Sequence, residues 1–185
     1  MGRLTYTAIA SLDGFVEDES GDFGWAMPDH EVHAFVNDLG RGVGTELYGR
    51  RMYETMAVWQ TIGEDGPVSD VEADFAEQWR AQDKVVFSTT LDAVWTPRTT
   101  LERRFDPAAV ERLKAERDHE LAISGPGIAA HAFRAGLVDD VHLLLFPVVV
   151  GGGKPALPRG SVVRLELLEE RRFGNGVVHL HHRVR

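Results

Sequence analysis

The segment from residue 122 to residue 158 constrains the fold of this chain more than any other. It begins with a short apolar run, passes through Gly125, Pro126 and Gly127, and continues as an amphipathic stretch and a second apolar run. This order is typical of a strand, a glycine turn, a helix and a further strand. Such a turn lets the backbone approach a ligand closely, and the helix N-terminus offers free N–H groups and a partial positive charge. The turn suits a phosphate group, although an ordinary loop would use the same residues.

Strand-like and helix-like patterns alternate through the rest of the chain. We expect strands at residues 4–10, 45–48, 84–87, 99–105, 120–124 and 143–150. We expect helices at residues 28–39, 50–56, 71–82 and 107–117. Two late strands, residues 162–172 and 177–184, flank Asn175 and Gly176, and Asn-Gly between strand-like runs is a strong signal for a β-hairpin.

This alternation predicts one α/β domain over residues 1–185, with a largely parallel sheet that helices cover on both faces. In such sheets, ligands bind at the carboxyl ends of the strands. Four expected strands end in small, hydroxyl-bearing or cationic residues of the kind that bind phosphate, at residues 11–14, 49–51, 88–90 and 125–127. Four matching strand ends favour a phosphate-bearing ligand over unrelated turns.

Composition excludes several classes of function. The formal net charge of -9 argues against binding to nucleic acid or to an anionic membrane, because both need clustered positive charge. We therefore expect small molecules, or further copies of the chain, as partners. The absence of cysteine excludes disulfides, thiolate metal sites and a cysteine nucleophile. No signal-peptide pattern is found, and the longest apolar run is too short to span a membrane, so we expect a cytoplasmic protein.

Three motifs give the chain a family resemblance: SLDGFV at residues 11–16, LYGRRMYETM at residues 47–56 and VVFSTT at residues 85–90. Together with the glycine turn and the GLVDD block within residues 125–158, they resemble the dihydrofolate reductase-like superfamily. Within it, the chain is similar to the riboflavin-biosynthesis reductase domain, the C-terminal part of a bacterial bifunctional deaminase-reductase. The resemblance covers nearly the whole chain. It implies a three-layer α/β/α fold with a central mixed, mostly parallel sheet and an antiparallel C-terminal hairpin, NADPH as hydride donor, and a homodimer paired through the late strands.

The resemblance also implies which residues bind NADPH. Backbone and guanidinium groups at the start of the second helix would meet the phosphates, hydroxyls at the end of the next strand would meet the adenosine 2′-phosphate, and the glycine turn would hold the pyrophosphate. These residues are Gly49, Arg50, Arg51, Ser88, Thr89, Gly125, Pro126, Gly127 and Ile128. The chain departs from the family pattern at Pro126, which separates two glycines that are commonly adjacent and removes one N–H donor.

Two carboxylates are candidates for the chemistry. Asp13 follows the first strand, where it could bind substrate or assist proton delivery, or could form only an Asx turn before Gly14. Glu31 could hold nitrogen atoms of the substrate, or could be only a first-turn acid that the helix dipole favours. Asp29 is the other acid near the position that folate reductases use for this purpose.

Apolar side chains close to the same expected pocket are Trp25, Met27 and Phe35, which could contact a substrate ring or could pack only in the core. His30 and His33 stand three residues apart beside Glu31, but no further ligand motif accompanies them. We therefore predict no metal site.

We expect an NADPH-dependent reductase that transfers hydride to a C=N or C=O carbon of a small heterocyclic substrate, pterin-like or pyrimidine-like. Dihydrofolate reduction proper is an alternative, and it requires Glu31 or Asp29 to face the nicotinamide. An alternative of another class is a non-catalytic, nucleotide-binding dimeric scaffold that has kept the fold and lost the chemistry.

Overall fold

The computed structural model describes residues 2–185. The strands are β1 (Leu4–Ser11), β2 (Phe15–Glu17), β3 (Val43–Gly49), β4 (Asp83–Phe87), β5 (Thr99–Glu102), β6 (Glu120–Ser124), β7 (Asp140–Phe146), β8 (Lys154–Pro155), β9 (Leu165–Arg172) and β10 (Val178–Val184). The α-helices are α1 (His30–Gly40), α2 (Arg50–Met56), α3 (Asp70–Ala81), α4 (Pro107–Glu116) and α5 (Pro126–Arg134). Two 3-10 helices are η1 (Gly24–Ala26) and η2 (Ala57–Gln60). None of the helices within residues 2–185 combines the length and hydropathy that spanning a bilayer requires.

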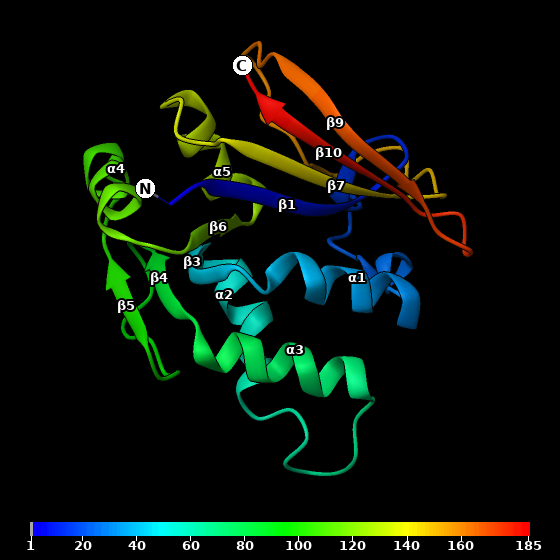
Figure 1. The fold of residues 1–185 in the computed structure, drawn as a ribbon, viewed down its shortest axis with the longest axis horizontal. Helices are drawn as coiled ribbons and strands as arrows, with labels where there is room; N and C mark the ends of the chain where they lie inside the picture. Colours follow the sequence, from blue (N-terminus) through cyan, green and yellow to red (C-terminus); the bar gives the residue numbers. More distant parts are fainter. Residues whose placement is uncertain (1) are drawn as a thin grey trace.

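Eight strands form one sheet in the order β5-β4-β3-β6-β1-β7-β10-β9. The first six strands in this order, from β5 to β7, are parallel to one another. Strand β10 runs antiparallel to both β7 and β9. The β9–β10 hairpin turns at Asn175 and Gly176, where Gly176 has a φ of +88°. The structure confirms the mixed, mostly parallel sheet with an antiparallel C-terminal hairpin (Figure 1). It adds a two-stranded sheet of β2 and β8 that the sequence patterns did not indicate.

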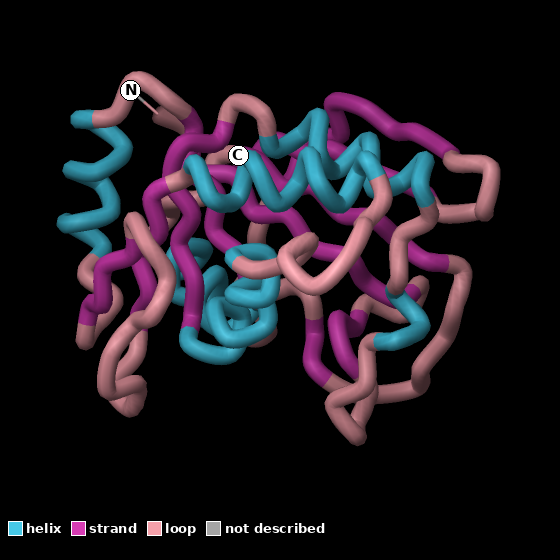
Figure 2. The backbone as a smooth tube through the Cα atoms, turned by 90° about the horizontal axis from the view of Figure 1, so that it is seen from below, coloured by secondary structure: helices cyan, strands magenta, loops and turns pink. Residues whose placement is uncertain are grey.

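Alternation of side chains along the strands gives the sheet two different faces. Leu4, Tyr6 and Leu47 point into the larger apolar core, which α4 and α5 cover. Glu46 and His142 alternate with these apolar positions and therefore belong to the opposite face, where they line one cleft with residues of α1 and α3. Helices α1 and α3 lie together on one side of the sheet (Figure 1). Seen from below, helices lie in front of the strands of the sheet (Figure 2). The face toward α1 therefore carries polar groups under a helical cover.

Local polar residues determine where three helices begin. The Asp29 side chain accepts a backbone hydrogen bond at the start of α1, and Ser69 and Glu72 form a capping box at the start of α3. Asp106 caps α4 ahead of Pro107, which occupies the first turn. The observed bounds of helices α1 to α4 agree with the expected ones to within two residues.

Three expected strands are shorter than the sequence indicated. The apolar run to residue 150 leaves the sheet after Phe146, because Pro147 has no N–H to donate, and Val149 is 68% exposed. The strand expected from residue 162 begins only at Leu165, which is the residue that pairs with the last residue of β10. The strand expected to reach residue 105 ends at Glu102, beyond which the β4–β5 pairing stops.

Candidate functional site

A cleft of about 1260 Å³ opens at the carboxyl edge of the sheet. Its rim lies where β3 and β6 end, and its interior runs beneath α1 along the sheet face that carries Thr5, Thr7 and Glu46. Because β1, β3, β4 and β6 are parallel, the four strand ends singled out in the sequence lie at one edge of the sheet. The parallel pairing thus brings together turns that are far apart in the chain.

The turn at Gly125 is shaped for close approach to a ligand. Gly125 has a φ of +99°, and a Cβ atom there would lie 3.1 Å from the Cβ of Met52. Pro126 occupies the first turn of α5, where an N–H would have no intrahelical partner, so its ring removes no helical hydrogen bond. The N–H groups of Gly127 and Ile128 belong to the same turn and point toward the N-terminal end of the helix. This turn can therefore bind an anion with two N–H groups.

Arg50 joins α2 to the segment that follows β4. Its Nε donates to Glu54 Oε1 at 2.7 Å, and its Nη1 donates to Thr90 Oγ1 at 3.0 Å. Gly49, where β3 passes into α2, lies against the first turn of α5, since a Cβ there would be 3.6 Å from the Cβ of Ile128. The ends of β3, β4 and β6 are thus held around one rim, with a guanidinium among them.

Most of the predicted cofactor residues line this cleft, from Gly49 to Arg51 and from Gly125 to Ile128. Ser88 and Thr89 do not. Ser88 is buried, and its Oγ accepts backbone N–H groups from Thr90 at 3.2 Å and from Leu91 at 3.0 Å, which shapes the turn after β4. Thr90 is the residue of this turn that reaches the cleft.

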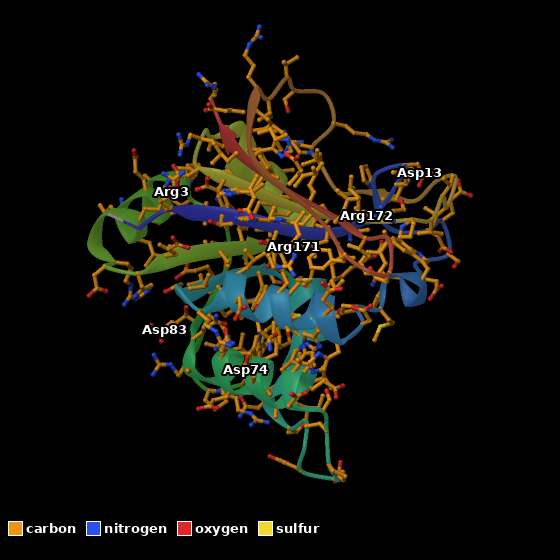
Figure 3. The ribbon with its side chains drawn as sticks, turned by 45° about the vertical axis from the view of Figure 1, so that its right-hand side comes forward. Arg3, Asp13, Asp74, Asp83, Arg171 and Arg172 are labelled. Carbon is orange, nitrogen blue, oxygen red and sulfur yellow. The ribbon has the colours of Figure 1, made fainter. Side chains whose placement is uncertain are left out.

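Asp13 lies outside this cleft, on the loop that follows β1 (Figure 3). Its carboxylate accepts the backbone N–H of Val150 at 3.2 Å and that of Gly151 at 2.8 Å. A hydrogen bond from Ser11, followed by those two backbone bonds, holds the pKa of Asp13 below its usual value. The ionised carboxylate therefore links the loop after β1 to the loop that contains Val150 and Gly151. The predicted part of Asp13 in the chemistry therefore finds no support in its position.

Glu31 is not among the residues that line the cleft. Its Oε2 accepts the backbone N–H of Gly174 at 3.1 Å, and its Oε1 lies 3.4 Å from the guanidinium of Arg171, which Figure 3 labels. These contacts join α1 to the β9–β10 hairpin. Asp29 does line the cleft, although one of its oxygens caps α1.

Met27 is the one of the three predicted apolar substrate contacts that lines the cleft within residues 2–185. Trp25 and Phe35 pack instead against a second core cluster that contains Phe173. The centroid of the Phe35 ring lies 5.2 Å from that of Phe173 and 4.7 Å from that of His179. For Trp25 and Phe35 the geometry favours core packing.

Glu46 is an acid inside the cleft that no sequence motif singled out. It lies on β3, and Ser124 on the neighbouring strand β6 donates from Oγ to its Oε2 at 3.4 Å. Burial raises the pKa of Glu46 to about 7, against smaller opposing effects of Ser124, the charge of Lys84 and the hydroxyl of Tyr48. The cleft therefore contains a carboxyl that titrates near neutral pH.

His142 lines the cleft from β7 and belongs to a cluster of histidines. Its Nδ1 lies 2.9 Å from Nε2 of His179, and its ring stacks on that of His181 with 4.1 Å between the centroids. Burial, then the charges of His181 and His179, lower the pKa of His142 to about 4. Its imidazole is therefore neutral at neutral pH and offers the cleft a hydrogen-bonding group.

A protein-family model described as the RibD C-terminal domain matches residues 3–179, which is nearly the whole described chain. The chain belongs to the RibD C-terminal domain family. This confirms the resemblance to the riboflavin-biosynthesis reductase domain.

Relatives of this RibD C-terminal domain include the uncharacterized protein YyaP of Bacillus subtilis (strain 168), which is 28% identical over 185 residues that cover 96% of this chain and 93% of that protein. A solved structure from Shewanella sp. PV-4, named for riboflavin biosynthesis, is similar with a TM-score of 0.76 at 19% identity and covers 99% of both chains. A pyrimidine reductase-like protein from Corynebacterium diphtheriae gives 0.68 at 16% identity, over 100% of this chain and 92% of that one. These likenesses confirm the dihydrofolate reductase-like fold.

Sequence motifs assigned no individual role to three cleft residues of this RibD C-terminal domain, namely Thr90, Ser124 and Glu46, although Thr90 lies within the strand end at residues 88–90. Ser124 carried a signal, because a hydroxyl directly before Gly125 lies at the strand end already singled out. Thr90 carried the same signal beside Ser88. Glu46 carried a weaker one, since an acid in mid-strand is ordinarily a solvent-facing residue.

Proposed function

We propose that this RibD C-terminal domain is an NADPH-dependent reductase of a small heterocyclic substrate, pterin-like or pyrimidine-like. When bound, NADPH supplies a hydride to the carbon of a C=N or C=O group, and the protein orients the reactants and supplies charge. One observation carries the proposal: the free N–H groups at the start of α5 and the guanidinium of Arg50 line the same cleft. Phosphate groups are the ligands that such an arrangement binds well.

The residues of the rim fit a dinucleotide. Gly125 has a φ of +99°, and a Cβ there would lie 3.1 Å from the Cβ of Met52, so a glycine is needed for the turn that presents the N-terminus of α5. Gly127 and Ile128 would donate their N–H groups to the pyrophosphate, and Arg50 with Thr90 would bind a second phosphate from the other side. Arg51 lines the same rim and adds positive charge. Ser88 would act by shaping the turn that presents Thr90.

The substrate would lie in the part of the cleft that continues beneath α1. Met27 and Asp29 line its mouth, and apolar side chains that include Val36 and Ala122 line its interior. Apolar walls exclude water, which strengthens the electrostatic contacts that orient a polar ring.

Titration with NADPH and then with NADH tests the proposal. Trp59 and Trp79 line the cleft, so bound reduced nucleotide should quench tryptophan fluorescence in a saturable way. Arg112→Ala, on the outer surface of α4 and outside the cleft, is the matched control and should bind as the parent does. Failure of both nucleotides to bind at millimolar concentration would contradict the reductase proposal.

The two alternatives make different predictions in the same experiment. Dihydrofolate reductase activity requires dihydrofolate to accelerate NADPH oxidation. The contacts of Glu31 with Arg171 and Gly174 weigh against a part for Glu31, so Asp29, which lines the cleft, is the acid that this alternative would use. A non-catalytic scaffold would bind NADPH and would oxidise none of it with any pterin or pyrimidine acceptor.

We further propose that the protein is cytoplasmic and forms a homodimer. Strand β9 lies at the edge of the sheet, and its Leu167 and Leu168 are 49% and 40% exposed. An exposed edge strand with apolar side chains is a common site for pairing with another chain. A net charge of -9 argues against nucleic acid as the partner.

A further inference from the structure

Glu46 lies on the cleft side of the central sheet. Thr45 and Leu47, its neighbours on β3, are fully buried, and Leu47 packs in the core beneath α4 and α5. Because successive side chains of a strand point to opposite faces, Glu46 projects toward α1 and α3. It lines the interior of the cleft, as does Ala122, which lies opposite it on β6.

The hydrogen bonds around Glu46 hold its carboxyl in place. Trp79 donates from Nε1 to the hydroxyl of Tyr48 at 3.1 Å, and an indole N–H can only donate. The Tyr48 hydroxyl is therefore an acceptor toward Trp79, and its own proton is free for the carboxylate of Glu46, which lies two residues away on the same face of β3. Ser124 donates to the carboxyl from β6 at 3.4 Å. Two hydroxyls are thus available to orient the acid.

No cation forms an ion pair with Glu46 among the described residues. Lys84 belongs to the same sheet face, but its Nζ donates to the carbonyl of Gln82 at 2.9 Å and lies 4.1 Å from the centroid of the Trp79 ring. The charge of Lys84 offsets only part of the cost of this carboxylate, because desolvation is the larger effect on its pKa. A ligand that brought positive charge and N–H groups would remove that cost.

The surroundings suit a flat ligand. Ile9 and Val36 are apolar residues on two sides of the interior, and Leu39 and Ala122 extend the apolar lining. Thr7 and His142 add neutral hydrogen-bonding groups on the same face of the sheet, and Glu46 adds the carboxyl. Carboxylates bind amidine-like groups through two parallel N–H···O hydrogen bonds, which fix both position and orientation.

We propose that Glu46 anchors the substrate by accepting hydrogen bonds from an amidine-like, N–H-rich edge of its ring. This inference rests on the proposed reductase function only for calling the ligand a substrate, and it concerns a part of the cleft that the cofactor rim does not include. It names the chemical class that the cleft selects: planar nitrogen heterocycles or amidines that present two adjacent N–H donors.

Benzamidine is the probe that tests this proposal without turnover. Its amidinium stays charged in neutral solution, so the groups of the protein decide any pH dependence of binding. His142 is neutral at these pH values because its pKa is lowered to about 4, and burial lowers the pKa of Lys84 to about 8. Between about pH 5.5 and about pH 7.5, ionisation of Glu46 should therefore strengthen benzamidine binding roughly tenfold. NMR chemical-shift titration measures that affinity.

Two variants make the test specific. Glu46→Gln should weaken benzamidine binding at the higher pH roughly tenfold and abolish the pH dependence. Glu120→Gln, which removes another acid that lines the cleft, should leave both unchanged. Should Glu46→Gln fold poorly, Ser124→Ala retains the carboxyl, and loss of a hydrogen bond that lowers the pKa of Glu46 should move the midpoint of the pH dependence upward.

NADPH titration of the same variants separates the two proposals. Binding of NADPH to Glu46→Gln with parental affinity, together with lost benzamidine binding, supports the anchor. Benzamidine binding that is absent, independent of pH or unaffected by Glu46→Gln overturns it, even where NADPH binds normally. Failure of NADPH to bind to any of the proteins contradicts the reductase function and leaves the benzamidine result to be judged by itself.

Discussion

The side chains of Glu46 and Ser124 meet at 3.4 Å across the neighbouring strands β3 and β6. Ser124 immediately precedes Gly125, so this contact joins the interior acid to the turn that we propose holds the pyrophosphate. Register explains the meeting, because Tyr48 pairs with Ser124 and Glu46 pairs with Ala122. The proposed cofactor rim and the proposed substrate anchor are therefore neighbouring parts of one pair of strands.

Gly125→Ala should weaken both folding and NADPH binding. The φ of +99° and the 3.1 Å approach to Met52 strain any side chain there, at a cost of about 1–3 kcal/mol in the free energy of unfolding. Gly127→Ala is the matched control for stability: a Cβ at Gly127 meets nothing within 4 Å, and a helical alanine should stabilise by about 0.5–1 kcal/mol. Urea unfolding measures both. Equal stability of the two variants would show that the turn is not strained.

Arg50→Ala should reduce affinity for NADPH by roughly tenfold to a hundredfold, the range for a lost hydrogen bond to a charged group. The same change should make binding less sensitive to salt, because one cation is removed. Isothermal titration at two ionic strengths measures both effects. Unchanged affinity would mean that the guanidinium serves only Glu54 and Thr90, its two partners in the fold.

Stability should fall in acid because of the buried histidines. The pKa of His142 and that of His179 are both lowered to about 4, so below the ordinary value of 6.5 the unfolded chain binds more protons than the folded one. Stability then rises with pH from about 4 to about 6.5, by roughly 1.4 kcal/mol per pH unit for each proton. Denaturant unfolding of His142→Gln should show a smaller slope over this window.

Light scattering should give twice the chain mass of 20.5 kDa if copies pair through β9. Leu167→Glu places a charge on the exposed edge and should shift the protein toward the monomer. Glu170→Gln, on the same strand, is a control in which no apolar contact is lost. A monomeric parent at high micromolar concentration would contradict the homodimer.

Periodicity predicted most of the fold because its signals are local. The hairpin at Asn175 and Gly176 and the capped starts of the helices are decided by a few adjacent residues. The end of β7 at Phe146 was not predicted, because the expected strand was extended through the apolar residues beyond Pro147, whose missing N–H ends the pairing.

The candidate site was only partly predictable, for a physical reason. Motifs indicated the rim around Gly49 and Gly125, where backbone conformation carries the signal. The place of Asp13 depends on Val150 and Gly151, which approach it from far along the chain. Burial of Glu46 likewise depends on distant elements that cover its face of the sheet. Contacts between residues far apart in the chain cannot be read from a local sequence pattern.

A crystal structure of the protein with NADP⁺ tests the central claim most directly. The account predicts pyrophosphate oxygens within hydrogen-bonding distance of the N–H groups of Gly127 and Ile128, with the nicotinamide in the cleft that contains Glu46. Nucleotide bound elsewhere on the molecule, or a turn at Gly125 that holds no phosphate while nucleotide is bound, would contradict it.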